Sequence, residues 1–487
     1  MTIYLLLILF AAPVAAIILS LAVGRSRIAE YATVTAAIVD LVVSVPLLLG
    51  TLQGSIVLAH DYIRVDSLSA WVILCTSVVY SLSSIYAVGY MRLLNEEDRL
   101  PLFYALFSGF AVTMLVASVM NNVGVFWIAI ELTTLISTFL VGFEQEAEST
   151  EAAWKYIVVV SGGISLALLG TVLFYWGGSF VLGPSYAMTW AALHRSAPEV
   201  YPPLLLVSFL LVLVGYGTKA GLAPMHTWLP DAHSESPAPV SAMLSGALLN
   251  TSMLGIARFL GVVHGTSVDH FAHSAVVVLG IFSFVIAALF IVRQTGIKRL
   301  MAYSSVEHIG VIALGFGFGG VLGIAGSLYH MLNHSLNKSL MFFGSGNAMR
   351  AYGTKEILGI RHALKTFPVS GILWLLGAVG IAGAPPFALF LSEFTILRAG
   401  IGGPYRWAAL FFVFFLIVVF IAFLAHFRAM YFDEAPEQKI RPLPWVLWRT
   451  LPMWLAFIPL LVLGLWWPHG LWNIFSQIAL QMTGGAG

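Results

Sequence analysis

The sequence predicts an all-α polytopic membrane protein with about fourteen transmembrane helices. Of the 487 residues, 60% are hydrophobic and 9% are charged, and the mean hydropathy is +0.94. Soluble globular domains carry roughly 25% charged residues, so most of this chain is solvated by lipid. Apolar stretches of about 20 residues, the length of a membrane-spanning helix, recur from end to end. Two of these stretches are interrupted by Gly and Pro.

The spans follow the apolar runs in chain order. They are expected at residues 3–23, 29–51, 68–90, 101–119, 122–143, 153–176, 203–229, 238–263, 271–293, 299–318, 321–349, 367–398, 406–430 and 451–473. We divide the chain into helices 1–3 (residues 1–100), a first five-helix repeat (101–264, helices 4–8), a second repeat (265–431, helices 9–13), and a cytoplasmic loop with helix 14 (432–487).

The repeat prediction rests on matching positions. Because each repeat has five helices, the second copy is inverted relative to the first. The second helix of each copy carries an acid, Glu131 or Glu307, and the fourth helices are interrupted at TKAGLAPMHTWLP and GIAGAPPFALFLSEF. Gly and Pro are common in membrane helices anyway, but interruptions at corresponding positions favour a repeat with two broken helices around a transport path.

The distribution of Lys and Arg predicts the orientation. With the N-terminus outside, the connections facing the cytoplasm hold sixteen of the 23 basic residues, Lys439 and Arg441 among them, and the opposite side holds five. Cytoplasmic loops carry the excess of positive charge. We therefore expect a prokaryotic cytoplasmic (inner) membrane protein with both termini on the outer side.

Several kinds of chemistry are not expected in this chain. The net charge of +1 predicts no nucleic-acid partner, and the single cysteine, Cys75, forms no internal disulfide and holds no metal or cluster alone. Phosphate loops, nucleotide fingerprints and nucleophile elbows are missing from the sequence. We expect no catalytic residue, no cofactor and no metal site here.

Lys219 lies in the seventh apolar stretch, five residues before Pro224. An ammonium in hydrocarbon costs roughly 2.5–3.5 kcal/mol or more, so it is expected in a wet cavity or beside an acid. Glu131, nine residues after Asn122, lies at about mid-membrane at 1.5 Å per residue. A paired Glu131 and Lys219 would hold each other charged, and separating them would release a proton. A static ion pair that only fixes helix packing explains these two residues equally well.

Further titratable residues follow on later helices. His330, His334 and Lys338 recur every four residues, so they share one face of a helix and can pass a proton through water bridges. Glu393 is a candidate exit group; the alternative is pairing with an outer basic residue. For proton uptake, we consider the residues near the cytoplasmic side: His226, Glu307 and His308. The spacing of the acids and histidines in HTWLPDAHSE suggests metal ligands, but the prolines interrupt the helical register. We interpret this run as the cytoplasmic mouth of the cavity.

These motifs resemble the proton-pumping antiporter-like subunits of complex I, Mrp antiporters and membrane-bound hydrogenases. The most specific are KAGLAPMHTWLPDAHSESPAPVSAMLSG, IKRLMAYSSVEHIG, HMLNHSLNKSLMFFGSGN and GAPPFALFLSEF. The SSVEHIG, NHSLNKSLMFF and LSEF forms are most similar to the F-type membrane subunit of hydrogenase 4.

The resemblance implies fourteen helices with two inverted repeats, and it implies proton-transfer roles for Glu131, Lys219, Lys338 and Glu393. At Ser245, many relatives have a histidine. A serine does not titrate in that role, so the link between the half-channels is expected to use water or His330 and His334.

The resulting hypothesis is a proton-translocating, non-redox membrane subunit of a hydrogenase-4-like, formate hydrogenlyase-like or NADH dehydrogenase-like complex. Its partners would be other membrane subunits and a cytoplasmic-facing redox module carrying iron–sulfur clusters with nickel–iron or flavin. The alternative is the membrane subunit of a cation/proton antiporter, or of an inorganic-carbon uptake system with a cytoplasmic zinc subunit. A third hypothesis is a structural subunit with a vestigial channel.

Overall fold

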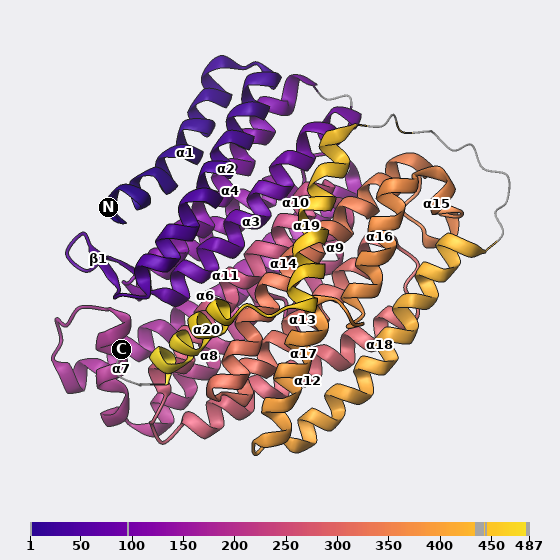
Figure 1. The fold of residues 1–487 in the computed structure, drawn as a ribbon. Helices are drawn as coiled ribbons and strands as arrows, with labels where there is room; N and C mark the ends of the chain where they lie inside the picture. The colour runs from indigo at the N-terminus through magenta and orange to yellow at the C-terminus, as the bar shows by residue number, and fades with distance from the viewer. Residues whose placement is uncertain (1, 95–96, 434–442, 444–445, 484–487) are drawn as a thin grey trace.

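The fold is a bundle of long helices that run side by side (Figure 1). The computed structural model describes residues 2–94, 97–433, 443 and 446–483. Lys439 and Arg441, used above for the orientation, lie outside the described residues. The predicted all-α membrane fold is confirmed.

Twelve segments of the described chain are long and apolar enough to cross a membrane. They are formed by α1 (Thr2–Val23), α2 (Ser26–Thr51), α3 with η1 (Ser67–Tyr90, Met91–Leu94), η2 with α4 (Glu97–Arg99, Leu100–Val119), α5 (Val123–Val141), α6 (Ala147–Leu182), α8 with η4 and α9 (Pro202–Ala220, Met225–Thr227, Trp228–Glu235), α10 with η5 and α11 (Ala238–Met243, Leu244–Leu248, Leu249–Val263), α12 (Asp269–Val292), α13 (Ile297–Phe318), α18 (Arg406–Phe432) and α19 (Leu447–Leu465).

Two further passes bring the segments to the predicted fourteen. The first is α14 (Gly320–Tyr352), which has 33 residues but is more polar than the other passes. The second is the broken pair α16 (Pro368–Ile381) and α17 (Ala388–Gly402). Both predicted interruptions are therefore present, between α8 and α9 and between α16 and α17. The inverted relation of the two five-helix groups stays a prediction.

The most polar helix lies in the centre of the bundle. Residues 323–348 of α14 are buried, and its neighbour α13 and the segment from α10 to α11 are buried almost throughout. In contrast, α1 and α18 expose most of their apolar side chains. Charged side chains are costly in lipid. The polar residues of α14 are tolerated because protein, not lipid, surrounds them.

Short elements lie at the ends of the bundle. They are the antiparallel hairpin of β1 (Ile56–Leu58) and β2 (Ile63–Val65), α7 (Trp190–Ser196) with η3 (Ala197–Glu199), η6 (Ile357–Gly359) and α15 (Ala363–Thr366).

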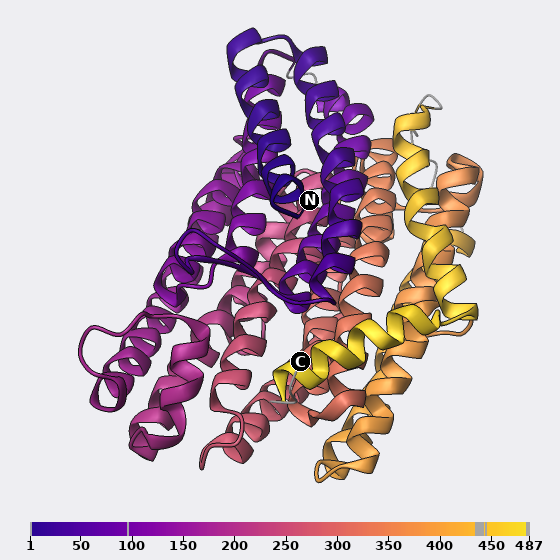
Figure 2. The ribbon, with the colours of Figure 1, turned by 60° about the vertical axis from the view of Figure 1, so that its left-hand side comes forward.

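The sequence-based boundary of the last pass is wrong at its C-terminal end. The span expected at 451–473 ends at Leu465, and a separate helix, α20 (His469–Met482), follows. The chain is extended at Trp466, and Pro468, which lacks an N–H, precedes the new helix. Figure 2 shows α20 lying across the long helices. Its buried face packs on α3 and α14, with Phe475 edge-on against Trp71 at 4.7 Å between ring centroids.

Candidate functional site

The Lys219 side chain is buried at the end of α8. The helix ends one residue later, at Ala220, and Gly221 adopts a left-handed conformation with φ +82°. The ammonium donates hydrogen bonds of 2.8 Å to Thr134 Oγ1 and 2.8 Å to the Tyr156 hydroxyl. Nζ also lies 5.1 Å from the centroid of the Tyr156 ring. Two hydroxyls and an aromatic face thus replace the water that Lys219 loses on burial.

Glu131 lies beside this group but does not form a direct ion pair with Lys219 among the described residues. Its Oε1 accepts a 2.5 Å hydrogen bond from Ser161 of α6, and its Oε2 lies 3.4 Å from Thr134 Oγ1. Thr134 follows Glu131 by three residues on α5 and therefore shares its face. The carboxylate is partly exposed. The two residues predicted to pair are joined through the hydroxyl of Thr134, with Glu131 at the edge of the bundle.

A second polar group occupies the centre of the bundle and comes from α13, α14 and α17. His308 Nδ1 is 3.0 Å from His330 Nε2 and 3.9 Å from Glu393 Oε1. His330 Nδ1 is 2.9 Å from Ser392 Oγ. The His308 ring is also 5.4 Å, centroid to centroid, from His334. We call His308, His330, His334, Ser392 and Glu393 the central cluster. It contains His308, a residue considered above for proton uptake, and the three predicted transfer residues His330, His334 and Glu393.

Glu393 is buried within this cluster. Its two carboxylate oxygens have no hydrogen-bond partner in the described part of the chain, and its nearest basic group there is His308. The alternative pairing with Arg398 is not seen among the ion pairs of the described residues; the two lie five positions apart on α17, on different faces.

Ser245 lies beside the central cluster and contacts both α13 and α14. It belongs to the π-helical turn η5, a local widening frequent at functional sites. Ser245 Oγ is 2.8 Å from Ser305 Oγ and 3.5 Å from His334 Nε2. Ser245 thus contacts the central cluster through its hydroxyl.

Lys338 and Glu307 are buried near the same cluster. Lys338 Nζ donates a 2.9 Å hydrogen bond to the carbonyl of Met301, and the carboxylate oxygens of Glu307 have no hydrogen-bond partner in the described part of the chain. His226 lies in the break after α8, with its ring 6.0 Å from that of Tyr303 on α13. Among the described residues, no hydrogen bond or ion pair joins His226 to Glu307 or His308.

A cavity of about 170 Å³ opens at one end of the bundle. The orientation predicted from the Lys and Arg distribution would place this end at the cytoplasm. Ion pairs line the cavity, between Arg350 and Glu144 at 3.2 Å and between Lys355 and Glu235 at 2.6 Å. Burial lowers the pKa of Lys355, but the hydrogen bond that its ammonium donates to Glu235 outweighs burial and leaves the pKa raised. Lys298 lies beneath and donates to the carbonyls of Ser234 and Ser236.

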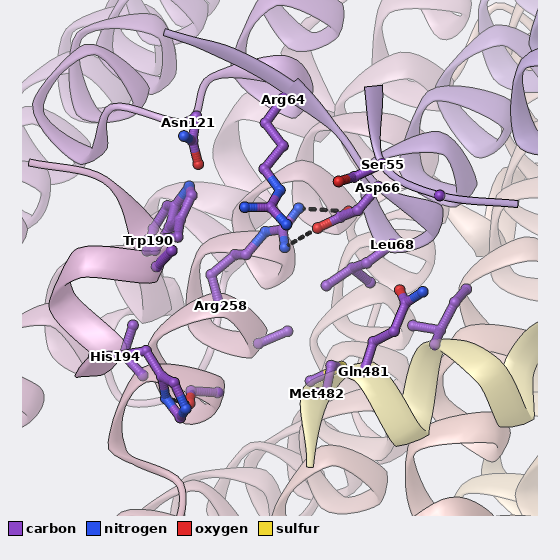
Figure 3. Close-up of a pocket in the computed structure, with 16 residues that line it drawn as sticks. Ser55, Arg64, Asp66, Leu68, Asn121, Trp190, His194, Arg258, Gln481 and Met482 are labelled. Carbon is purple, nitrogen blue, oxygen red and sulfur yellow. Dashed lines mark hydrogen bonds and ion pairs between the residues drawn. The ribbon is translucent and has the colours of Figure 1, made fainter. Parts of the chain in front are cut away.

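A larger cavity, of about 420 Å³, lies at the opposite end of the bundle. Figure 3 shows Arg258 of α11 reaching Asp66, which caps α3, with Arg64 beside them. Arg258 Nη2 is 2.7 Å from Asp66 Oδ1, and Asp66 accepts a 2.9 Å hydrogen bond from the Ser69 amide. Burial alone raises the pKa of Asp66, but Arg258 and the amide outweigh it and lower that pKa.

Sequence reasoning missed the hydroxyl groups that connect these sites. The missed residues are Thr134, Tyr156, Ser161 and Ser392. Ser, Thr and Tyr are common in membrane helices, so their identity carries little signal. Of these four residues, only Thr134 has a usable sequence signal, because it lies one helical turn after Glu131.

Comparison with known proteins identifies the family. The family described as "NADH:quinone oxidoreductase/Mrp antiporter, TM" matches residues 120–422. The chain is 36% identical over 345 residues to the hydrogenase-4 component F homolog of Methylacidiphilum infernorum, covering 70% of this chain and 72% of that protein. It is 29% identical to hydrogenase-4 component B of Escherichia coli, where the match spans 72% of this chain and about half, 51%, of the relative.

Solved structures share the fold. A chain of the membrane-bound sulfane sulfur reductase, an archaeal respiratory membrane complex, superposes with a TM-score of 0.88 at 22% identity, over 98% of this chain and 97% of that one. A chain of the Mrp complex from Dietzia sp. DQ12-45-1b gives 0.87 at 20% identity, over 99% and 98%. The resemblance predicted from the motifs is confirmed: this chain is a polytopic membrane protein of the NADH:quinone oxidoreductase/Mrp antiporter family.

Proposed function

We propose that this chain is the proton-translocating membrane subunit of a multi-subunit redox complex of the hydrogenase-4 or formate hydrogenlyase type. The observation that carries the proposal is the pair of buried polar groups: Glu131–Thr134–Lys219 in one half and the central cluster in the other. Titratable groups buried in a membrane protein are costly, and they mark ion paths. The similarity to hydrogenase-4 proteins supports the type of complex.

The Glu131–Lys219 group would act as the switch. An ionised Glu131 stabilises the Lys219 ammonium through the Thr134 hydroxyl. Glu131 lies at the edge of the bundle, where movement of a neighbouring membrane subunit changes its surroundings. Once its negative charge is neutralised or displaced, burial favours the neutral amine, and Lys219 gives up its proton.

The central cluster would receive that proton. It would pass by way of Ser245 and His334 to His308 and His330, and then to Glu393. A neutral imidazole accepts a proton on one nitrogen and donates from the other, so neighbouring histidines suit such a relay. Transfer between the two groups requires water or side-chain movement, because Lys219 donates its hydrogen bonds to Thr134 and Tyr156, not to the cluster. Lys338 and Glu307 would set the local charge.

Proton pumping by the intact complex in sealed vesicles tests the proposal. Lys219→Ala and Glu131→Gln should each lower the number of protons moved per electron while electron transfer continues. Matched controls are Lys155→Ala and Glu148→Gln, because both residues have exposed side chains on α6. Unchanged pumping in Lys219→Ala and Glu131→Gln would show that the path is wrong.

The same vesicles separate the alternatives. If proton movement needs Na⁺ and continues without electron transfer, a cation/proton antiporter is the better assignment. If the chain copurifies with a cytoplasmic zinc protein instead of redox subunits, inorganic-carbon uptake is favoured. The chemistry of the path favours H⁺ because amines and imidazoles line it, whereas Na⁺ prefers oxygen ligands.

A further inference from the structure

Three potential metal ligands meet where α11 connects to α12. His264 follows the last residue of α11, Asp269 begins α12, and His273 lies one turn later. One ligand atom from each lies within 4.8 Å of the others. His264 Nδ1 is 3.1 Å from Asp269 Oδ2, and His273 Nε2 is 3.3 Å from Asp269 Oδ1. All three side chains are partly exposed, so an ion has access from solvent.

Each of the two histidine nitrogens lies near a different oxygen of Asp269, at a separation close to that of neighbouring ligand atoms in a tetrahedral metal site. With metal–ligand bonds of roughly 2.0–2.1 Å, neighbouring ligand atoms in a tetrahedron lie about 3.3 Å apart. Two imidazoles and one carboxylate form a common donor set for Zn²⁺, and three protein ligands leave the fourth position for water.

The surrounding contacts orient the ligands. His273 Nδ1 is 3.0 Å from the carbonyl of Gly317 at the end of α13. A carbonyl only accepts, so Nδ1 carries the proton and Nε2 presents its lone pair toward Asp269. Metal-binding histidines are typically held by such a second hydrogen bond. Asp269 Oδ2 in turn accepts a 2.9 Å hydrogen bond from the Gly265 amide, which fixes the carboxylate against the connecting loop.

We propose that His264, Asp269 and His273 form a binding site for one divalent transition-metal ion, Zn²⁺ by its donor set. The ion would tie the end of α11 to the first turn of α12 and, through the Gly317 carbonyl, to α13. The site lies in the connection between the two predicted repeats and is separate from the proton path, so it stands whether or not the proposed function does.

Metal binding by chelator-treated full-length protein, purified without a polyhistidine tag, tests the proposal. Titration with Co²⁺ should give the visible absorption bands of tetrahedral coordination at one ion per chain, and Zn²⁺ should displace it. His264→Ala and His273→Ala should each weaken Zn²⁺ binding by roughly 100-fold or more, beyond the 10–100-fold loss typical of outer-sphere changes. His270→Ala is the control, since its exposed ring stacks on Tyr405 with centroids 6.2 Å apart.

Thermal unfolding provides a second measurement that detects misfolded variants. Zn²⁺ should raise the midpoint of the wild type and of His270→Ala but not of folded His264→Ala or His273→Ala, because only a bound ion stabilises the native state. Absence of tetrahedral Co²⁺ bands in the wild type overturns the proposal. Equal loss of binding in His270→Ala also overturns it, because that would indicate nonspecific imidazole binding. Retention of wild-type Zn²⁺ affinity in His273→Ala also overturns the proposal. The three residues would then only form a hydrogen-bonded cap at the start of α12.

Discussion

Thr134 joins Lys219 to Glu131: its hydroxyl accepts a 2.8 Å hydrogen bond from the ammonium and lies 3.4 Å from the carboxylate. The buried lysine and the acid at the edge of the bundle are therefore linked by a neutral side chain. Such a link transmits charge changes between them while allowing them to separate, which a direct ion pair would resist.

Thr134→Val should weaken this link. The valine keeps the shape but loses a hydrogen bond to a charged group, which contributes about 1.5–3 kcal/mol. We expect roughly tenfold or greater loss of proton pumping per electron in vesicles, with assembly intact. Thr138→Val is the control, because within the described residues Thr138 Oγ1 bonds only to the Thr134 carbonyl, at 2.7 Å. Equal losses in both variants would contradict a specific role for Thr134.

Ser245→Ala tests the link between α10–α11 and the central cluster. It removes the hydroxyl that lies 3.5 Å from His334 Nε2. If that hydroxyl carries protons, pumping should fall by at least about tenfold. Ser252→Ala serves as control, since Ser252 lies on the same segment and, in the described part of the chain, its hydroxyl bonds only to the Leu248 carbonyl. Wild-type pumping by Ser245→Ala would exclude the serine from the path.

Gly383→Ala should displace the Glu393 carboxylate. Gly383 lies in the break between α16 and α17 with φ +76°, and a Cβ there would be 2.3 Å from Glu393 Oε2. Gly353→Ala is a matched control, because its φ is +64° and no atom of the described residues would lie within 4 Å of a Cβ there. Both variants carry similar backbone strain. We expect only Gly383→Ala to lower pumping; equal defects would point to strain alone.

The ion pair of Asp66 and Arg258 should make stability depend on pH. The pKa of Asp66 is lowered from 3.8 in the folded state. Its contribution is therefore complete above the unfolded-state pKa and is lost as the pH falls through the lower folded pKa. Asn remains a good helix cap, so Asp66→Asn isolates the charge.

Thermal unfolding of the two proteins across pH measures this effect. The stability advantage of the wild type over Asp66→Asn should be largest near neutral pH and shrink below pH 3.8. The exposed Asp98→Asn is the control and should show no such trend. A pH-independent difference for Asp66→Asn would rule out an ionic contribution.

Phe475→Ala should release α20 from the bundle. The Phe475 ring is fully buried against Trp71, and truncating a buried Phe costs about 3–5 kcal/mol. Limited proteolysis should then cleave within α20 faster than in the wild type. Leu480→Ala is the control because that side chain is 49% exposed on the same helix. Unchanged protection in Phe475→Ala would show that other contacts hold α20.

The sequence alone determined the fold class, the fourteen passes, the two broken helices and the buried titratable residues. These features are local: a span needs only a sufficient apolar length, and a charge within it is costly wherever its partners lie. The sequence motifs also identified the protein family. The predicted end of the last pass, α19, is wrong because apolar residues continue past Pro468, so composition alone does not reveal that the chain turns there.

Only the tertiary structure decided which of these residues meet. Four contacts depend on how the helices rotate and how the connecting loops fold. They are the link through Thr134, the position of His308 beside His330 and Glu393, the contact of Ser245 with His334, and the grouping of His264, Asp269 and His273. Helix rotation is set by packing between segments distant in sequence, and periodicity along one helix does not encode it. Which buried titratable groups meet is thus a property of helix contacts, whereas the presence of these groups is a property of the sequence.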